Sequence, residues 1–144
     1  MADIKGFRGE RRFLSNFYQP AEVFGYRTVE NAYQAGKCEN KGLRGKFKNI
    51  SPGEAKQLGR RTALREDWEE IKLGVMLSLL KEKFTKHPKL RELLLATGDE
   101  ELVEWNTWHD NFWGICTCSK CASGIHQSEN HLGKLLMQIR RDLS

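Results

Sequence analysis

Three polar side chains in the stretch TVENAYQAGKC, residues 28–38, have a spacing at which they could act on one substrate. Glu30, Gln34 and Lys37 lie at positions i, i+4 and i+7, which share an arc about 60° wide on an α-helix. A lysine amine beside a glutamate in a partly dry cleft can attack an electrophilic carbon. A solvated helix face carries the same kind of polar line. The spacing alone leaves both interpretations open.

A second group of chemically capable residues lies in the stretch HDNFWG. Asp110 supplies an acid, and Trp113, with Gly114 beside it, supplies a flat face on which a base or sugar can stack. Trp113 is equally compatible with a place in the core. The element SNF adds an amide, Asn16, and an aromatic ring, Phe17, in a loop.

Three of the four cysteines form a C-x-C-x-x-C pattern, Cys116, Cys118 and Cys121, with His126 a few residues later. Three thiolates and one imidazole make a closed tetrahedral zinc site. Cys38 is another candidate for the fourth ligand, and ordinary reduced thiols are the alternative. A closed site leaves no position for water, so a zinc ion here is expected to brace the loop rather than to catalyse.

The elements that must position these groups are mostly helical. Thr28 is a suitable N-cap for a helix from Val29 to about Gly36 or Lys37, and SPGE is a capping box that opens a further helix at residues 51–54. Apolar residues at three- and four-residue steps predict a long helix over residues 68–87, a short one that stops at Gly98, and a last one from Asn130.

The remaining segments are expected to be irregular or extended. AEVFGYRTV resembles a short hairpin, so any small sheet is predicted in the opening third, and ELVEW is predicted to be extended. The basic stretch from Lys41 to Lys48 is more typical of a solvated loop than of a nucleic-acid patch, and contact with a polyanion stays open. Gly133 lies in the first turn of the last helix, where free backbone N–H groups can hold a phosphate, although close helix packing also explains a glycine there.

Composition limits the classes of function. The chain has 144 residues, which is enough for one domain over residues 1–144. The predicted elements make this domain mainly α with a minor β element. Its net charge is +5. The modest basic excess favours an anionic ligand without demanding nucleic acid. We find no signal-peptide core and no apolar run long enough for a bilayer, which predicts a cytoplasmic protein without a membrane partner.

The ordered combination of motifs resembles the YbiA-like or NADAR superfamily. The stretches FLSNFY, TVENAYQAGK, AKQLGRR, LRELLLATGDEELVEW, DNFWG and NHLGKLLMQIRRDL follow one another from about Gly6 to Leu143, nearly the whole chain. The departure is the segment Ile115 to Glu129, which is longer than the glycine-rich link of some relatives and contains cysteines. This difference concerns the rim of the substrate site more than its chemistry.

The resemblance implies a compact multi-helical domain that hydrolyses N-glycosidic bonds without a required cofactor. It implies catalytic roles for Glu30, Lys37 and Asp110. Its substrates would be ADP-ribose on guanine bases of nucleic acid, or phosphoribosylated intermediates of riboflavin synthesis. The remaining matched positions are implied to bind substrate, and they are Asn16, Phe17, Gln34, Trp113, Gly114, Asn130 and Gly133.

Two mechanisms and two other classes of function stay open at this stage. Lys37 attacks the anomeric carbon and forms a ring-opened Schiff base, or a carboxylate activates water directly. A non-catalytic reader of ADP-ribose or nucleotide would use the same residues and bind without releasing a base. A small zinc-braced nucleic-acid-binding module would show steep salt dependence and no need for Glu30 or Lys37.

Overall fold

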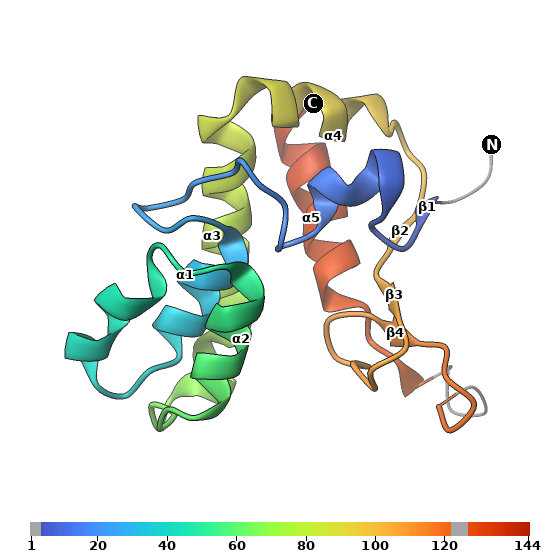
Figure 1. The fold of residues 1–144 in the computed structure, drawn as a ribbon. Helices are drawn as coiled ribbons and strands as arrows, with labels where there is room; N and C mark the ends of the chain where they lie inside the picture. Colours follow the sequence, from blue (N-terminus) through green and yellow to red (C-terminus); the bar gives the residue numbers. More distant parts are fainter. Residues whose placement is uncertain (1–3, 122–126) are drawn as a thin grey trace. The chain divides into compact units, whose positions relative to one another are not determined.

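The structure is a computed structural model that describes residues 4–121 and 127–144, and its architecture is mainly α with a small β component, as predicted (Figure 1). The elements in chain order are β1 (Ile4–Lys5), the 3-10 helix η1 (Gly9–Leu14), α1 (Val29–Gly36), the 3-10 helix η2 (Lys41–Phe47), α2 (Pro52–Arg60), α3 (Trp68–Lys86), α4 (Pro88–Ala96), β2 (Leu102–Val103), β3 (Trp105–Asn106), β4 (Ile115–Cys116) and α5 (His131–Leu143). Among the described residues, none of the helices combines the length and the apolar character that crossing a membrane requires.

The chain forms two compact units, which we describe separately. One is continuous and comprises Asn16–Leu90. The other joins Met1–Ser15 to Arg91–Ser144, so the boundary falls inside α4. The prediction of a single domain over residues 1–144 stays a prediction.

In the unit of residues 16–90, α1 begins where the sequence predicts because Thr28 caps it. The Thr28 Oγ1 accepts a hydrogen bond from the Asn31 backbone N–H at 3.2 Å. Asn31 itself is fully buried, and its Nδ2 donates to the carbonyl oxygens of Phe47 and Ile50 at 2.7 and 2.8 Å. One amide therefore anchors the chain after η2 to the start of α1.

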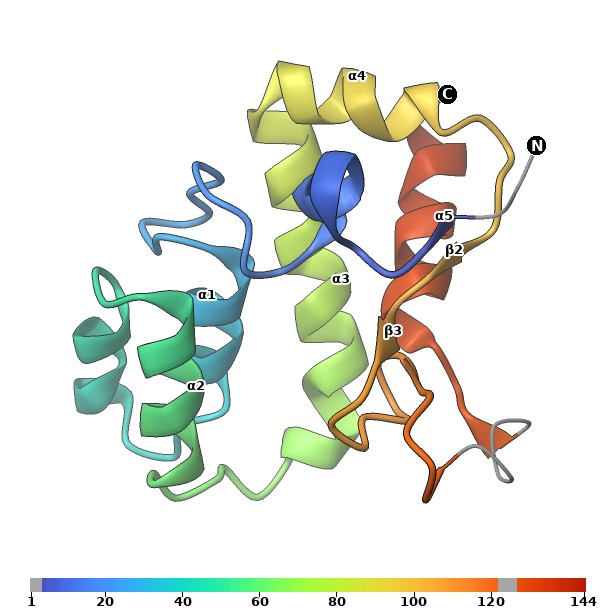
Figure 2. The same ribbon diagram turned by 45° about the vertical axis from the view of Figure 1, so that its right-hand side comes forward.

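Helix α2 packs beside α1 in this unit (Figure 2). Its N-terminus has the predicted capping box, in which Ser51 and Glu54 each accept from the other's backbone N–H. Between these helices lies an apolar cluster with Ala35, Cys38, Phe47 and Ala55 at its centre. Phe47 is fully buried at the end of η2, so the basic stretch predicted as a solvated loop is a 3-10 helix anchored by one aromatic ring.

Helix α3 supports the opposite side of α1. The rings of Tyr33 and Trp68 lie 5.1 Å apart between their centroids. Gly36 also faces α3, where a Cβ would meet Val75 Cγ1 at an ordinary contact distance of 3.6 Å. Tyr33 and Gly36 therefore mark the side of α1 that packs on α3.

The other unit contains both described sheets, so the prediction of a sheet in the opening third is wrong except for β1. Parallel pairs join β1 to β2 and β3 to β4. The expected hairpin is reduced to one antiparallel bridge between Val23 and Tyr26, across a turn at Phe24 and Gly25 with positive φ at both. No longer ladder forms there because the cap of α1 at Thr28 follows almost at once.

The β3–β4 pair is closed by an unusually short connection. Parallel strands usually need a crossover of about a dozen residues or more, and here only residues 107–114 lie between the strands. Helix α5 packs on β2 in the same unit. Gly133 permits this contact, because a Cβ there would overlap the carbonyl oxygen of Leu102.

We expect Asn31→Ala to destabilise the protein by about 2–4 kcal/mol, because two buried carbonyl groups lose their donor. Ser51→Ala at the exposed cap of α2 should cost about 1 kcal/mol. Urea unfolding followed by far-UV circular dichroism would measure both. Equal losses in the two variants would contradict the anchoring role of Asn31.

Candidate active site

The polar line of α1 is buried. Glu30 is 7% exposed and Gln34 is 4% exposed, so a solvated helix face is excluded as the explanation of their spacing. Gln34 Nε2 donates a hydrogen bond to Glu30 Oε2 at 2.8 Å. A carboxylate removed from water needs such donors, and the amide one turn away supplies one.

Lys37 follows at the C-cap of α1 and is half-buried. Burial lowers the pKa of its amine below the ordinary lysine value, and the positive charges of Arg60 and Lys56 lower this pKa further. The negative charge of Glu30 opposes these effects in part. The amine is therefore deprotonated more readily than that of a surface lysine, which is the state that attacks carbon.

Gly59 of α2 is the residue that makes room for this line. A Cβ at Gly59 would overlap Gln34 Oε1 and would lie 2.9 Å from Lys37 Cε. The side chains of Gln34 and Lys37 thus lie directly against the backbone of α2. Nothing in the sequence AKQLGRR reveals this role, because an isolated helical glycine has several explanations.

The SNF loop contacts the start of α1. The backbone carbonyl of Asn16 accepts a hydrogen bond from the Glu30 N–H at 3.1 Å, and Asn16 Nδ2 lies 3.6 Å from Met76 Sδ. Asn16 Oδ1 is buried and has no hydrogen-bond partner among the described residues. Phe17 is 40% exposed, and Lys56 Nζ lies 6.0 Å from the centre of its ring. The loop therefore holds Asn16 and Phe17 in the same unit as Glu30 and Lys37.

A second lysine with an unusual environment lies on α3. Lys83 is fully buried, and burial lowers the pKa of its amine to about 7. Its Nζ lies 5.8 Å from the ring centre of Tyr18 and 5.1 Å from that of Phe84. The sequence analysis missed Lys83 because it follows the apolar spacing of a long amphipathic helix without any local motif.

In the other unit, Asp110 shapes the loop between β3 and β4. Its Oδ1 accepts hydrogen bonds from the backbone N–H groups of Phe112 and Trp113, at 3.1 and 2.9 Å. The buried Asn106 side chain holds the same loop, since its Nδ2 donates to the Asp110 carbonyl at 2.7 Å and its Oδ1 accepts from the Asp110 N–H at 3.1 Å. One carboxylate oxygen of Asp110 is thus engaged by the backbone.

Trp113 and Gly114 follow in this loop. Trp113 is partly exposed and belongs to an aromatic group with Phe112 and His131, with ring centres 4.8 Å apart for Phe112–Trp113 and 6.4 Å for Trp113–His131. Gly114 is buried, and a Cβ there would overlap the Glu104 carbonyl oxygen and lie 3.0 Å from Asn106 Nδ2. The glycine is therefore needed for close backbone packing at this point.

Asn130 and Gly133 also make close contacts with backbone. Asn130 has the left-handed conformation, with φ of 48°, immediately before α5. Its Oδ1 accepts from the Glu104 N–H and its Nδ2 donates to the Leu102 carbonyl, both at 3.0 Å. The amide side chain thereby joins the start of α5 to β2 and β3. Substrate binding by Asn130 and Gly133 stays a prediction beside this structural role.

Glu104 is a candidate functional residue that the sequence analysis missed. It lies between β2 and β3, and burial raises the pKa of its carboxyl to about 7. The negative charge of Asp110 raises this pKa further, while Arg8 opposes it. A carboxyl that holds its proton near neutral pH is suited to donate it to a leaving group. The one signal in the sequence was an acidic residue inside ELVEW, a stretch that otherwise resembles a strand.

The cysteine pattern is brought together with a different histidine from the predicted one. The ligand atoms of four residues lie within 4.8 Å of one another, and these residues are His109, Cys116, Cys118 and Cys121. We refer to them as the His/Cys cluster, which has a donor set that could hold a metal ion. The predicted fourth ligand, His126, lies outside the described residues. Cys38 lies in the unit of residues 16–90, where its Sγ is 3.6 Å from the Gln34 carbonyl.

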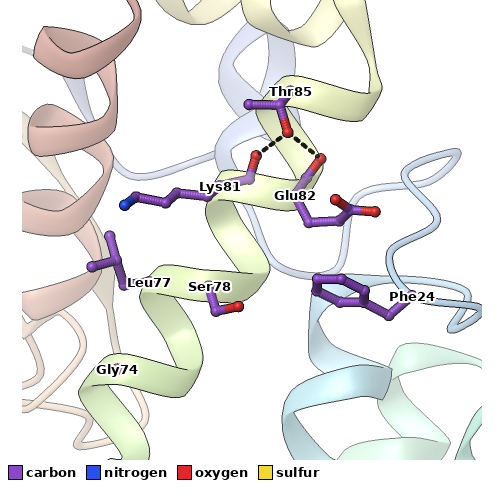
Figure 3. Close-up of a pocket in the computed structure, with 7 residues that line it drawn as sticks. All are labelled: Phe24, Gly74, Leu77, Ser78, Lys81, Glu82 and Thr85. Carbon is purple, nitrogen blue, oxygen red and sulfur yellow. Dashed lines mark hydrogen bonds between the residues drawn. The ribbon is translucent and has the colours of Figure 1, made fainter.

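Two hollows in the unit of residues 16–90 are separate from the predicted site residues. One of about 400 Å³ lies along α3, between Phe24 and residues such as Ser78 and Glu82 (Figure 3). The other, of about 480 Å³, shares Gly74 and Ser78 with it. Neither is lined by a residue that the sequence predicts for the site.

The predicted site residues thus form two groups. Glu30, Gln34 and Lys37, with the SNF loop, belong to the unit of residues 16–90. The second group belongs to the other unit and comprises Asp110, Trp113, Gly114, Asn130 and Gly133. Each group is ordered by its own contacts.

The sequence of the chain matches the family model described as the NADAR domain over residues 6–144, a range that includes almost all of both units. The chain belongs to the NADAR family. It is 40% identical over 124 residues to an N-glycosidase of Nostoc punctiforme, an alignment that covers 82% of this chain and 74% of the relative.

Two further similarities agree with this assignment. The chain is 38% identical to the N-glycosidase YbiA of Escherichia coli, covering 91% of this chain and 81% of YbiA. The NMR structure of Escherichia coli YbiA matches the fold with a TM-score of 0.78 at 35% identity, over 99% of this chain and 86% of that one. The NADAR chain therefore groups with hydrolases that act on N-glycosyl bonds.

A third relative has a different name. The chain is 36% identical to a chloroplastic riboflavin biosynthesis protein, PYRR, of Zea mays, over 85% of this chain but only 20% of the plant protein. The similarity is thus confined to one part of that longer protein.

We expect Glu104→Gln to change how stability depends on pH. The folded carboxyl has a pKa of about 7 and the unfolded one about 4.5, so the folded state binds more protons between these values and stability falls as pH rises through this window. A glutamine side chain does not titrate, so the variant does not lose stability in this way. Above pH 7 the variant should be more stable than the parent by about 1–3 kcal/mol.

Urea unfolding at pH 5, 6, 7 and 8 would measure this difference. Asp110→Asn is the matched control, because it removes the like charge while leaving Glu104 in place, and it should move the window to lower pH. Parallel pH profiles for the parent and Glu104→Gln would show that the Glu104 carboxyl does not titrate in this range.

Proposed function

We propose that this protein is an N-glycosidase that hydrolyses the bond between a base and the anomeric carbon of a phosphorylated ribose. The observation that carries the proposal is the buried Glu30–Gln34 pair beside Lys37, whose amine has a lowered pKa. The names of the relatives from Nostoc punctiforme and Escherichia coli support the same reaction class.

The preferred mechanism uses Lys37 as the nucleophile. The C–N bond breaks with its electron pair on the base nitrogen, which takes a proton from a carboxylic acid, while the Lys37 amine forms a bond to the anomeric carbon. Loss of the amine proton and opening of the ribose ring give a Schiff base, which water hydrolyses to the free sugar and the free lysine. The reaction as written needs no cofactor.

Glu30 is assigned to stabilise positive charge that develops at the anomeric carbon. Its carboxylate is fixed by Gln34 Nε2, so it does not have to reorient during the reaction. The catalytic role of Asp110 stays a prediction, and within its own unit the neighbouring Glu104 carboxyl has a raised pKa that suits proton donation. In the rival mechanism a carboxylate activates water, and Lys37 only binds the substrate.

The groups around Lys37 also suit a phosphorylated sugar. Lys56 and Arg60 contribute positive charge at Lys37, and such charge attracts phosphate. Phe17 offers an exposed ring for stacking, and Asn16 Oδ1 is an acceptor without a partner among the described residues. Stacking of Trp113 on a base or ribose stays a prediction.

Two substrate classes have this chemistry. One is ADP-ribose attached to guanine bases of nucleic acid, and the other is a phosphoribosylated intermediate of riboflavin synthesis. The name of the Zea mays relative supports the second class. We place the reaction in the cytoplasm, the compartment that the sequence analysis expects.

The direct test is to incubate the protein with ADP-ribosylated guanine DNA and, separately, with phosphoribosylated riboflavin intermediates. We expect release of ADP-ribose or of ribose 5-phosphate, followed by chromatography, from one of the two. Binding of either compound with no release of sugar would identify a non-catalytic reader and would contradict the proposal.

Isosteric variants test whether the carboxyl groups act in the chemical step or only support the fold. Glu30→Gln and Asp110→Asn should each lower the rate by about a hundredfold to ten-thousandfold while changing thermal stability little. Asp110→Asn keeps the Oδ1 acceptor for the Phe112 and Trp113 N–H groups, so the loop should stay closed. A rate loss that follows a loss of melting temperature would instead make these residues structural.

Borohydride trapping distinguishes the two mechanisms. If Lys37 forms the Schiff base, reduction during turnover should leave a substrate-derived adduct that peptide mass spectrometry locates on Lys37. Lys37→Arg should abolish it, because the guanidinium stays protonated and cannot attack. Lys83 is an internal control, since its buried amine also has a lowered pKa. An adduct on Lys83, or none during rapid turnover, would reject Lys37 as the nucleophile.

A further inference from the structure

The His/Cys cluster has four ligand atoms on a short stretch of one unit. His109 lies in the loop after β3, Cys116 ends β4, and Cys118 and Cys121 follow in the next turn. This segment is the orange part of the ribbon around β4 (Figure 1). All four residues are described, and the three cysteines are free thiols.

The distances in the His/Cys cluster are close to those of a tetrahedral zinc site. His109 Nδ1 lies 3.4 Å from Cys118 Sγ, 3.4 Å from Cys121 Sγ and 3.9 Å from Cys116 Sγ. Zinc bonds of about 2.0–2.1 Å to nitrogen and about 2.3 Å to sulfur, at tetrahedral angles, place nitrogen and sulfur about 3.5 Å apart. The imidazole therefore already has the correct spacing from the three sulfurs.

Two N–H groups, one from a backbone and one from a side chain, donate to sulfur atoms of the cluster. The His109 backbone N–H donates to Cys116 Sγ at 3.3 Å, and Asn111 Nδ2 donates to Cys121 Sγ at 3.6 Å. The Cys121 N–H donates to the Cys118 carbonyl at 3.0 Å, which closes a tight turn between these two ligands. Hydrogen bonds to sulfur stabilise thiolates, and partners of this kind orient metal ligands.

The backbone of His109 is strained in a way that fits ligation. Its φ is 69°, in the left-handed region that non-glycine residues rarely adopt. This conformation accompanies two contacts with the cluster, the N–H bond to Cys116 Sγ and the placement of Nδ1 near Cys118 and Cys121. A conformation that costs free energy persists where the surrounding interactions require it.

We propose that one Zn²⁺ binds in a closed tetrahedral site made by one imidazole and three thiolates, namely His109, Cys116, Cys118 and Cys121. A donor set of three sulfurs and one nitrogen is typical of structural zinc. With four protein ligands no position is open for water, so the ion joins loop segments and takes no part in glycosidic cleavage. This assignment replaces the predicted His126 with His109.

The site has a consequence for the neighbouring loop. Asp110 directly follows His109. The next residue, Asn111, donates a hydrogen bond from its Nδ2 to Cys121 Sγ and accepts one at its Oδ1 from the Cys116 N–H at 2.9 Å. Zinc would therefore fix the loop between β3 and β4 at both of its ends. Binding free energy at such a site also stabilises the fold of the unit.

The test measures zinc in the full chain, purified with a non-thiol reductant, saturated with zinc and then desalted. We expect about one zinc per chain. Cobalt in place of zinc should show the visible bands of a tetrahedral thiolate site together with sulfur-to-metal charge transfer. A zinc content near zero after saturation, or octahedral cobalt bands, would overturn the proposal.

Single variants assign the ligands by competition with a coloured chelator. His109→Ala and Cys121→Ser should each weaken zinc affinity by more than the roughly 10–100-fold that loss of an outer partner costs. His126→Ala should bind as the parent does, and so should Cys38→Ser, the matched control for loss of a thiol. Loss of affinity in His126→Ala but not in His109→Ala would overturn the assignment of the fourth ligand.

Thermal unfolding separates ligation from misfolding. Zinc should raise the melting temperature of the parent and of Cys38→Ser, and a chelator should reverse the rise. Far-UV circular dichroism of each variant checks that its helices have formed. A parent protein whose melting temperature does not respond to zinc or chelator would contradict a structural metal.

Discussion

The close approach of α1 and α2 at Gly59 is the constraint on which the candidate chemistry depends. Without a side chain at this position, Gln34 lies against the α2 backbone and can hold Glu30 by its amide. Burial then has two effects with one origin, since it both requires a donor for the carboxylate and lowers the pKa of the Lys37 amine. The polar line is buried because the neighbouring helix excludes water from it.

In the other unit, very little β-sheet is available to hold the loops in place. Its strands have two residues each, so backbone ladders satisfy few polar groups. Asparagine side chains form hydrogen bonds with these backbone groups instead. Asn106 fixes the Asp110 turn, Asn111 joins Cys116 to Ser128, and Asn130 connects β2, β3 and α5. An amide both donates and accepts, so one side chain can replace a pair of ladder bonds.

Much of the helical framework could be predicted from the sequence, because it depends on local signals. Thr28, the Ser51–Glu54 box and the apolar spacing from Trp68 are read within a few residues of the helix ends they define. The parallel strand pairs could not be predicted in this way. The β1–β2 pair joins residues that are distant in sequence, and the β3–β4 pair has a connection shorter than parallel strands usually need. The hairpin at Val23 is shorter than its sequence predicts, because the cap of α1 at Thr28 follows the bridge to Tyr26 closely.

In the candidate site, too, the features with local signals could be predicted and those that depend on packing could not. Glu30, Gln34 and Lys37 were recognisable as one line from helical periodicity, but their burial depended on Gly59, which no local pattern marks. Glu104 and Lys83 were missed because their unusual protonation arises from packing rather than from motif. His109 was overlooked as a ligand since it precedes the cysteines by several residues, and only the β3–β4 pairing brings it to them.

The short connection between β3 and β4 has a consequence for how relatives can differ in length. The side chains of Asn106 and Asp110 bind several backbone groups of residues 107–114, so an added residue in this connection would disrupt these hydrogen bonds. A residue added after Cys116 would lie outside this connection and would leave the hydrogen bonds of Asp110 in place.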